Sequence, residues 1–328
     1  MDQRPVAGVL LGGTSPEREV SLASGEAVAA ALETEGWHVR RYDYGAGGED
    51  QYGELSARLE HAVTEGPLAD AEVVFIVLHG GAGEDGRVQG WFEMAGIPYA
   101  GTGVLGSAAS MDKWITKSLA REVGIAVPGG VLWHRGEQVA VEVIEADWGA
   151  RLGWPLVIKP VDGGSTVGLT IAQSVDEVPD ALALAGRFSQ TVLVEEYIPG
   201  REVTVAVLGD DALPVIEIIP SHGIYDYECK YTAGMSSYIC PAELPADVTR
   251  DLQDAALTMF RALHHRDFSR IDFRMTEDLA FYLLEGNTLP GFTSTSLVPK
   301  AAAAAGIEFG ELCSRIVGSA INREVALR

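Results

Sequence analysis

The chain has 328 residues, of which 47% are hydrophobic, so it is long and apolar enough to build two or three domains with buried cores. Its 47 acidic residues outnumber 24 basic ones, which gives a formal net charge of −23. Such an excess of negative charge opposes binding to nucleic acid and to anionic membrane surfaces. We therefore expect no nucleic-acid and no membrane partner, and a bound polyphosphate would need a local positive site.

Cysteine usage and hydropathy indicate a cytoplasmic protein. The cysteines are odd in number and lack metal-ligand spacing, which is typical of reduced thiols: Cys229, Cys240 and Cys313. The apolar run near the N-terminus, residues 6–11, is too short for a signal peptide. No segment reaches the length that a membrane-spanning helix needs.

The N-terminal stretch predicts an α/β unit. Residues 6–11 form a continuous apolar run that ends in two glycines, and a capping-box pattern then begins a helix over residues 17–35. Strand, glycine turn and helix open an α/β domain. The glycines do not follow the dinucleotide-binding pattern, which disfavours a nicotinamide cofactor. Glu19 lies in the first helical turn, where a carboxylate ordinarily complements the helix dipole.

A second glycine-rich loop is expected beside the first. Residues 73–78 form another buried strand, and His79 and a glycine-rich stretch follow it. Ligands bind beyond the carboxyl ends of parallel strands, where both loops would lie. A single histidine at a strand end is as often structural as functional, so the residues alone leave its role open. Residues 97–117 close this domain.

The middle of the chain offers a candidate phosphate site. Residues 156–159 form a strand that carries Lys159, and a glycine-rich turn over residues 160–168 follows. The turn lacks the P-loop pattern, so the chain is not a P-loop enzyme. A hairpin that covers phosphates and a plain hairpin turn both fit these residues. A further strand, residues 192–197, carries acidic groups on both faces.

Two strands at residues 203–209 and 213–219 lead into a long loop, residues 221–243, which contains Lys230 and Tyr231. Loops of this length in compact domains tend to be functional. Four tyrosines in this loop argue against a plain solvated surface.

Residues 269–297 are the stretch that organises the chain. Alternating segments at residues 270–275 and 279–287 flank a short polar turn and predict a hairpin. A two-residue turn would place Arg270 opposite Glu285. Side chains alternate along a strand, so the polar residues share one face and the apolar ones point to a core. The polar set is Arg270, Asp272, Glu285 and Asn287, and the apolar set is Ile271, Phe273, Tyr282 and Leu284.

Two carboxylates on one sheet face repel each other by roughly 4 kcal/mol at about 4 Å and an effective dielectric near 20, so a cation is expected between them. Asp272, Glu285 and the amide oxygen of Asn287 are hard oxygen ligands, which favour magnesium or manganese. The alternative is a solvated strand face on which Arg270 pairs with one carboxylate.

The residues after Asn287 predict an anion site. Pro290 and Gly291 end the strand, and Gly291 leaves a backbone N–H open to a ligand. A helix then begins near Ser294 or Ser296 and ends at Gly306. Metal ligands, a cation, an exposed N–H and a helix N-terminus suit phosphate and a developing oxyanion.

With these pieces in order, the chain resembles the D-alanine–D-alanine ligases of the ATP-grasp superfamily over nearly its whole length. The resemblance rests on eight ordered blocks: LLGGTSPEREVSLASG, LHGGAGEDG, IPYAGTGVLGSAASMDKWITK, IKPVDGGSTVG, VEEYIPGREVTV, YDYECKY, RIDF and EGNTLPGFTSTSL. One departure is Gly286, which stands where a branched apolar residue is usual and should loosen that strand.

The resemblance implies a three-domain α/β ATP-grasp fold. Residues 1–107 would form an N-terminal parallel α/β substrate domain, residues 108–197 a central α+β lid domain, and residues 198–328 a C-terminal α+β catalytic domain. ATP would bind between the last two. The resemblance further implies a homodimer.

The resemblance also assigns site residues. Those implied for ATP are Lys117 and Lys159 on the phosphates, Ser165 in the lid, Glu195, Glu196 and Ile198 around adenine, Glu202 on the ribose, and Lys230. Those implied for two Mg²⁺ or Mn²⁺ ions are Asp272, Glu285 and Asn287. Those implied for the substrates are Glu19 on the ammonium of the first D-alanine, His79 beside it, Arg270 and the Gly291 N–H at the oxyanion, and Ser296 and Leu297 at the second substrate. A hydrogen-bonded set of Ser165, Glu202 and Tyr231 would tie down the loop at residues 221–243.

The implied activity is ATP-dependent joining of two D-alanines through an acyl phosphate, for peptidoglycan precursors. Water would destroy the acyl phosphate, so the chemistry needs a closing loop. A relative that uses D-lactate or D-serine as second substrate is the alternative, and Tyr231 favours D-alanine. A catalytically silent nucleotide-binding regulator would have lost a metal ligand or Arg270, and all are present.

Overall fold

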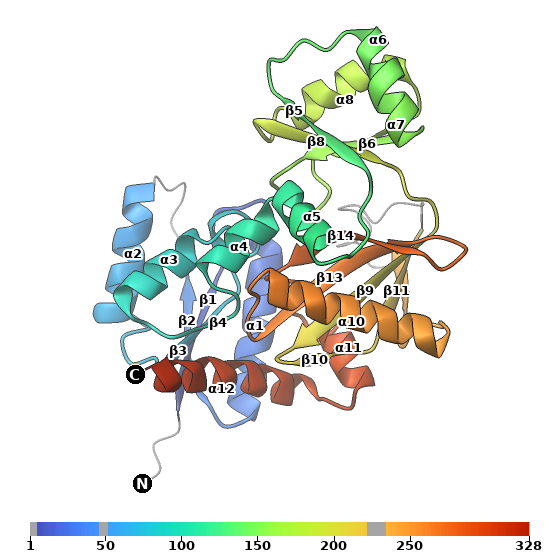
Figure 1. Cartoon of the computed structure of the whole chain (residues 1–328). Coiled ribbons are helices and arrows are strands. Elements are labelled where there is room, and N and C mark those ends of the chain that lie inside the picture. Colours follow the sequence, from blue (N-terminus) through green and yellow to red (C-terminus); the bar gives the residue numbers. More distant parts are fainter. Residues whose placement is uncertain (1–4, 46–51, 222–233, 328) are drawn as a thin grey trace.

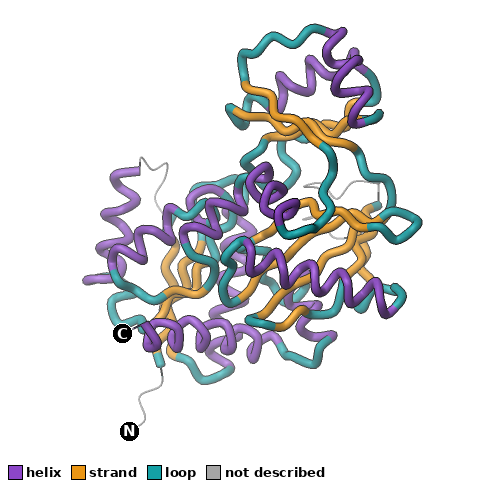
Figure 2. Tube along the Cα trace, viewed as in Figure 1, coloured by secondary structure: helices purple, strands orange, loops and turns teal. Residues whose placement is uncertain are grey.

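The computed structural model describes residues 5–45, 52–221 and 234–327. Lys230 and Tyr231 therefore lie outside the described residues. The described elements form three sheets, each with its own helices, and the unit built on the second sheet stands apart from the other two (Figure 1). A tube coloured by secondary structure shows the loops that join this unit to the rest (Figure 2).

The N-terminal unit is the predicted parallel α/β domain. Its sheet has the order β2-β1-β3-β4, and every described pairing in it is parallel. The strands are β1 (Val6–Leu11), β2 (His38–Asp43), β3 (Val73–Ile76) and β4 (Tyr99–Ala100). The helices are α1 (Arg18–Thr34), α2 (Tyr52–Thr64), the short η1 (Gly81–Gly83) and α3 (Arg87–Ala95). The first strand and the first helix thus agree with the sequence prediction to within a residue at each end.

Two helices, α4 (Val104–Met111) and α5 (Lys113–Glu122), connect this unit to the next. Ala120 at the end of α5 and Ile125 after it belong to the same buried cluster as Phe273 and Leu283 of the third sheet. The expected domain boundary between residues 107 and 108 falls within α4 and stays a prediction.

The central unit is an antiparallel sheet with the order β5-β8-β6-β7. Its strands are β5 (Gly130–His134), β6 (Leu156–Pro160), β7 (Thr170–Ala172) and β8 (Thr191–Glu196). Its helical segments are α6 (Val141–Val143), η2 (Ile144–Gly149), α7 (Ala150–Leu152), η3 (Val175–Glu177) and α8 (Val178–Ala185). These segments bury Trp148 and Leu182 against one sheet face in a small core of its own. A separate core lets this unit hold its shape while its loops reach the site.

The C-terminal sheet has the order β12-β11-β9-β13-β14, with β10 on β9. Its strands are β9 (Arg201–Leu208), β10 (Asp211–Ala212), β11 (Ile216–Pro220), β12 (Ser236–Ile239), β13 (Phe268–Met275) and β14 (Phe281–Asn287). Its helices are α10 (Ala246–Ala262), α11 (Leu297–Ala304) and α12 (Phe309–Leu327). This sheet shares its largest core with the N-terminal unit, where the rings of Phe75, Phe268 and Phe292 lie 5.0–5.8 Å apart.

The β13–β14 hairpin is present, but its predicted register is wrong. Arg270 lies opposite Asn287, and Asp272 lies opposite Glu285. The turn is longer than two residues, because the Thr276 N–H donates to the Ala280 carbonyl and β14 begins after it.

A β-bulge after Asp272 corrects the predicted core face as well. Phe273 pairs with Leu283, so Leu284 is the extra residue of the bulge. Leu283 is fully buried, whereas Tyr282 is half-buried and Leu284 lines a pocket. Strand alternation had placed Glu285 and Asn287, but not Leu284, on the polar face of β14. The bulge turns Leu284 toward that face as well.

Candidate active site

The floor of the site is the polar face of β13 and β14. Arg270 donates from Nε and Nη2 to the two carboxylate oxygens of Asp272, both at 2.8 Å. Asn287 donates to the same carboxylate at 2.9 Å, and Thr204 of β9 donates to it at 2.6 Å. Asp272 is 5% exposed, so these four bonds compensate a nearly buried charge. Arg270 thus pairs with one carboxylate, the arrangement that the sequence offered as the alternative.

The second carboxylate of the floor faces a lysine that the sequence interpretation missed. Lys113 Nζ lies 3.4 Å from Glu285 and donates to the Gly163 carbonyl of the central unit at 2.5 Å. The Asp112 side chain caps α5 by accepting from the N–H groups of Trp114 and Ile115, which fixes Lys113 at the first helical turn. The sequence signal that could have identified Lys113 is Asp112, the helix-capping residue directly before it.

Lys117 and Lys159 share one partner, Glu195. Lys117 Nζ is 2.5 Å from one oxygen of Glu195, and Lys159 is 2.7 Å from the other. The Lys117 side chain is fully buried, and its implied contact with the ATP phosphates stays a prediction. Burial lowers the pKa of Lys117 to about 8, and the Glu195 carboxylate limits this drop. Burial alone would raise the pKa of Glu195, but the two lysines outweigh burial and lower it.

A pocket lies between the floor and the glycine-rich turn that joins β6 to β7. The described side chains lining it include Lys113, Lys159, Ser165, Glu202, Asp272 and Glu285. Both lysine side chains are 11% exposed, and both face this pocket from different units. Lys113 and Lys159 therefore bring two cationic side chains to the wall of one pocket.

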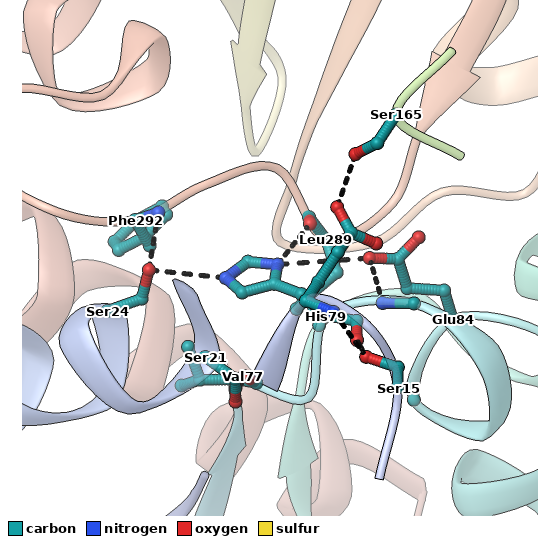
Figure 3. A network of polar contacts seen from close by, with 12 residues as sticks. Ser15, Ser21, Ser24, Val77, His79, Glu84, Ser165, Leu289 and Phe292 are labelled. Carbon is teal, nitrogen blue, oxygen red and sulfur yellow. Dashed lines mark hydrogen bonds and ion pairs between the residues drawn. The ribbon is translucent and has the colours of Figure 1, made fainter. Parts of the chain in front are cut away.

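The glycine-rich turn closes over the pocket as a lid. Ser165 and Thr166 have φ angles of 51° and 64°, in the left-handed region that non-glycine residues rarely adopt. Ser165 Oγ donates to Glu17 Oε1 at 2.5 Å, and so links the lid to the start of α1 (Figure 3). The expected partner set of Ser165 included Tyr231, which lies outside the described residues. Among the described residues, Glu202 Oε2 lies 3.5 Å from Arg274 Nη1.

Glu17 contacts the lid, and the expected Glu19 lies two residues further along the chain. Glu19 is exposed on α1, whereas Glu17 is half-buried under the lid. Gly80 has a φ of 73°, which favours glycine, and an added Cβ there would lie 2.7 Å from Glu17 Oε2, so Glu17 lies against the loop after His79. Glu17 therefore sits between the two glycine loops at the strand ends, where a substrate ammonium is expected.

His79 connects the N-terminal unit to the turn that carries Gly291 (Figure 3). Its Nδ1 is 3.1 Å from the Leu289 carbonyl, so this nitrogen carries the proton and donates. Its Nε2 is 3.2 Å from Ser24 Oγ, which in turn accepts from the Phe292 N–H at 3.3 Å. His79 is 4% exposed, and these bonds hold both sides of the Gly291 turn.

The helix after this turn begins as predicted. Ser296 is the N-cap of α11, and its Oγ accepts from the Thr293 N–H at 3.0 Å. An added Cβ at Gly291 would lie 3.3 Å from Ser296 Oγ, so the glycine leaves this part of the turn open. Leu297 is buried as the first residue of the helix.

The comparisons with known proteins agree along the whole chain. Residues 47–102 match the family described as D-ala D-ala ligase N-terminus, and residues 119–318 match D-ala D-ala ligase C-terminus. The D-alanine–D-alanine ligase of Syntrophotalea carbinolica is 43% identical over 99% of this chain and 98% of its own length. That of Gloeobacter violaceus is 45% identical over 96% of this chain and 99% of its own.

The chain belongs to the D-alanine–D-alanine ligase family.

Solved structures show that its fold is the ATP-grasp fold of this family. A Bacillus anthracis D-alanine–D-alanine ligase complexed with ATP matches with a TM-score of 0.82 and 29% identity, over 99% of this chain and all of the other. The VanG D-Ala:D-Ser ligase of Enterococcus faecalis matches with a TM-score of 0.81 and 34% identity, over 96% of this chain and 99% of the other. The three-domain fold implied by the sequence is confirmed.

The donor set of this ligase-family floor fits a hard divalent cation. In the part of the chain that the structure describes, no three His, Cys, Asp or Glu residues cluster as metal ligands. The set is instead two carboxylates and an amide, all oxygen donors, and each carboxylate already faces a cationic side chain. Magnesium is usually held by one or two carboxylates together with substrate phosphates, and this set supplies those carboxylates.

Gly286, the departure from the family pattern, has a local cause. An added Cβ would lie 3.0 Å from Leu263 and 3.2 Å from the His265 ring, both beneath the floor. The residue still pairs with Ile271 in the ladder.

Among the described helices, none is long and apolar enough to cross a membrane.

Proposed function

We propose that this chain joins two molecules of D-alanine into D-alanyl-D-alanine, a peptidoglycan precursor, and converts ATP into ADP and phosphate. The observation that carries the proposal is one pocket that collects a cationic pair, a carboxylate floor and a lid. Membership of the ligase family supplies the substrate class.

A carboxylate is a poor electrophile, so it must be activated before an amine can attack it. The first D-alanine carboxylate takes the γ-phosphoryl group of ATP and becomes an acyl phosphate. Lys113 and Lys159, which both line the pocket, stabilise the negative charge of the phosphates. The amine of the second D-alanine then attacks the acyl carbon, and phosphate leaves.

The attack creates an oxyanion, for which the floor and the Gly291 turn supply donors. Arg270 is fixed by Asp272, and the Gly291 turn is fixed by His79 and Ser24 on either side. Donors that are held in place before the reaction cost no reorganisation when charge develops. We assign the oxyanion to Arg270 and the Gly291 N–H.

The substrates lie on either side of this point. Glu17 takes the ammonium of the first D-alanine, in place of Glu19, because its carboxylate faces the lid and the His79 loop. Ser296 and Leu297 at the start of α11 take the carboxylate of the second, since a helix N-terminus favours an anion.

Asp272, Glu285 and Asn287 would hold two magnesium or manganese ions. When bound, these ions neutralise phosphate charge and orient the γ-phosphoryl group. In the chain as described, Arg270 and Lys113 balance the same carboxylates. The floor thus stays close to neutral before the nucleotide binds.

On the nucleotide side, Glu195, Glu196 and Ile198 line the adenine pocket and Glu202 binds the ribose. Glu196 accepts from the Gly129 N–H at 3.2 Å, which fixes the end of β8 beside β5. Lys230, Tyr231 and the homodimer stay predictions.

The test measures phosphate release from purified protein with ATP and magnesium, and identifies products by mass. D-alanine is supplied alone, with D-lactate, and with D-serine. We expect turnover with D-alanine alone, giving the dipeptide. If turnover requires a mixed pair, the second substrate is D-lactate or D-serine and not D-alanine. If no set gives turnover, the proposed ligation is refuted.

A further inference from the structure

One arginine on the floor is not used by the chemistry above. Ile271, Phe273 and Met275 of β13 are buried, so the alternate side chains face the pocket side. Arg270 and Asp272 on that side belong to the oxyanion and metal sites. Arg274 continues the same row toward the nucleotide end and lies directly opposite Glu202 of β9.

Arg274 forms an ion pair with Glu202. Its Nη1 lies 3.5 Å from Glu202 Oε2, and the two side chains are 13% and 14% exposed. A pair this far from water is screened less than a surface pair, so the guanidinium attracts the carboxylate and restricts where it points.

Arg274 also contacts the segment that links the two units around the nucleotide. Its Nε donates to the Ile198 carbonyl at 3.2 Å, and its guanidinium lies 5.9 Å from the centre of the Tyr197 ring. Ile198 is 6% exposed, and a buried carbonyl needs a donor. Residues 197–200 follow β8 of the central unit and precede β9 of the C-terminal unit.

The same segment is pressed against the end of β13 by its backbone. Gly200 has a φ of 117°, and an added Cβ there would lie 2.2 Å from the Met275 carbonyl oxygen. The crossover from the central unit therefore meets β13 at two points, the Gly200 backbone and the Arg274 side chain.

We infer that Arg274 is a positioning residue for the adenosine part of ATP: it holds Glu202 toward the ribose hydroxyls and holds the residue 197–200 crossover beside the adenine pocket. The inference rests on the proposed function. Arginine suits this task because its planar guanidinium presents donors in a fixed fork, so that Nε reaches the carbonyl while Nη1 reaches the carboxylate. Lysine, a point charge on a flexible stem, makes one contact at a time.

Loss of Arg274 should act on the nucleotide and leave D-alanine alone. Arg274→Met leaves the Ile198 carbonyl without this donor and removes one of the contacts that orient the Glu202 carboxylate. Removing a charge-assisted bond in a buried place weakens binding by about tenfold or more. The dissociation constant and the KM for ATP should rise by that factor, while the KM for D-alanine stays within about twofold of the parent protein.

The decisive measurement is calorimetric titration with ATP, 2′-deoxyATP and 3′-deoxyATP. In the parent protein, a missing ribose hydroxyl should weaken binding severalfold, because Glu202 loses its hydrogen bond to that hydroxyl. In Arg274→Met, that penalty should fall, because Glu202 loses one of the contacts that orient it. Glu202→Gln should show the same reduced penalty, and the double variant should bind little worse than either single variant.

Arg315→Met is the matched control, because Arg315 pairs with Glu311 on the exposed face of α12, far along the chain from the nucleotide residues. Its titrations should match the parent protein. Arg274→Lys keeps the charge without the fork, and we expect an intermediate ATP affinity. This variant also serves if Arg274→Met fails to fold, as judged by circular dichroism.

An ATP dissociation constant within twofold of the parent, or a deoxyribose penalty that Arg274→Met and Arg274→Lys both leave unchanged, would overturn the inference. The titrations need no ligation. If the parent protein binds ATP but forms no dipeptide, the proposed function fails while the role of Arg274 is still decided.

Discussion

The two walls of the site are held in different ways. On the β13–β14 floor, each carboxylate faces a cationic side chain, Arg270 on Asp272 and Lys113 on Glu285. On the N-terminal wall, His79 and Ser24 bond to the backbone of the turn that carries Gly291. Figure 3 shows His79 between the Leu289 carbonyl and the Ser24 hydroxyl, with the Glu84 carboxylate also beside its ring.

The difference follows from what each wall must do. A single charge contact such as Lys113 with Glu285 can exchange its partner when another charge arrives, whereas the two hydrogen bonds from Arg270 to Asp272 hold their geometry. A hydrogen bond to a backbone group fixes position, since the backbone is held by its own fold. The Lys113 side of the floor is therefore suited to receive phosphate and cations, and the wall to keep the Gly291 N–H in place.

The largest effect is expected from the floor. Glu285→Ala removes a carboxylate that faces Lys113 and is assigned to the metal ions. We expect kcat for dipeptide formation to fall by about a thousandfold, since metal-based charge stabilisation contributes several kcal/mol. The circular dichroism spectrum should stay that of the parent. Glu311→Ala, an exposed glutamate on α12, is the control, and a Glu285→Ala variant as active as that control would contradict the assignment.

The next effect separates two glutamates that are two residues apart. Glu17→Gln keeps the hydrogen bond with Ser165 but removes the charge that a substrate ammonium needs. We expect the KM for the first D-alanine to rise by about a hundredfold, as for loss of one partner of an enclosed charge pair. Glu19→Gln, on the exposed side of the same helical turn, should behave as the parent. Initial rates at varied D-alanine decide it, and equal effects of the two variants would reject Glu17.

These glutamates show how far the sequence reached. Its patterns predicted the parallel sheet, the glycine-rich hairpin and the floor strands, because burial periodicity and turn residues are local signals. They did not separate Glu17 from Glu19 or Lys113 from Lys117. Each pair lies within a turn of a helix start, where the face that meets the site depends on how the helix packs on distant strands.

The register of the β13–β14 hairpin could not be predicted from the local sequence pattern either. Alternation predicted which residues of β13 face the core, and Ile271 and Phe273 are buried as expected. The bulge at Leu284 inserts one residue into β14, so every inference made across it from strand alternation shifts by one place.

A smaller effect is expected from the N-terminal wall. Ser24→Ala removes the hydroxyl that accepts from the Phe292 N–H and bonds to His79. A buried N–H left unpaired costs about 1–3 kcal/mol, so we expect the Gly291 turn to loosen and kcat to fall by about tenfold. The KM for ATP should not change. Ser118→Ala, whose hydroxyl bonds only along α5 to the Trp114 carbonyl among its described contacts, is the control in the same assay.

Equal losses of kcat in Ser24→Ala and in Ser118→Ala would mean that the wall does not position the turn. A rise in the KM for ATP with no loss of kcat would move Ser24 to the nucleotide end of the site. Either result would remove the distinction drawn between the wall and the floor.

The smallest effect concerns what supports the floor from below. His265 lies under Gly286 and bonds to the hydroxyls of Ser110 and Ser269, and burial lowers its pKa to about 3. Between about pH 3 and its ordinary value of 6.5, the unfolded chain binds a proton that the folded chain refuses. This residue's contribution to stability is therefore complete above pH 6.5 and is lost as the pH falls. From pH 7 to pH 6 it should lower the free energy of unfolding by about 1 kcal/mol, a share that His265→Asn should abolish in paired denaturant titrations. If both proteins lose the same stability over that step, His265 takes up its proton in the folded state, and the layer beneath the floor is open to water.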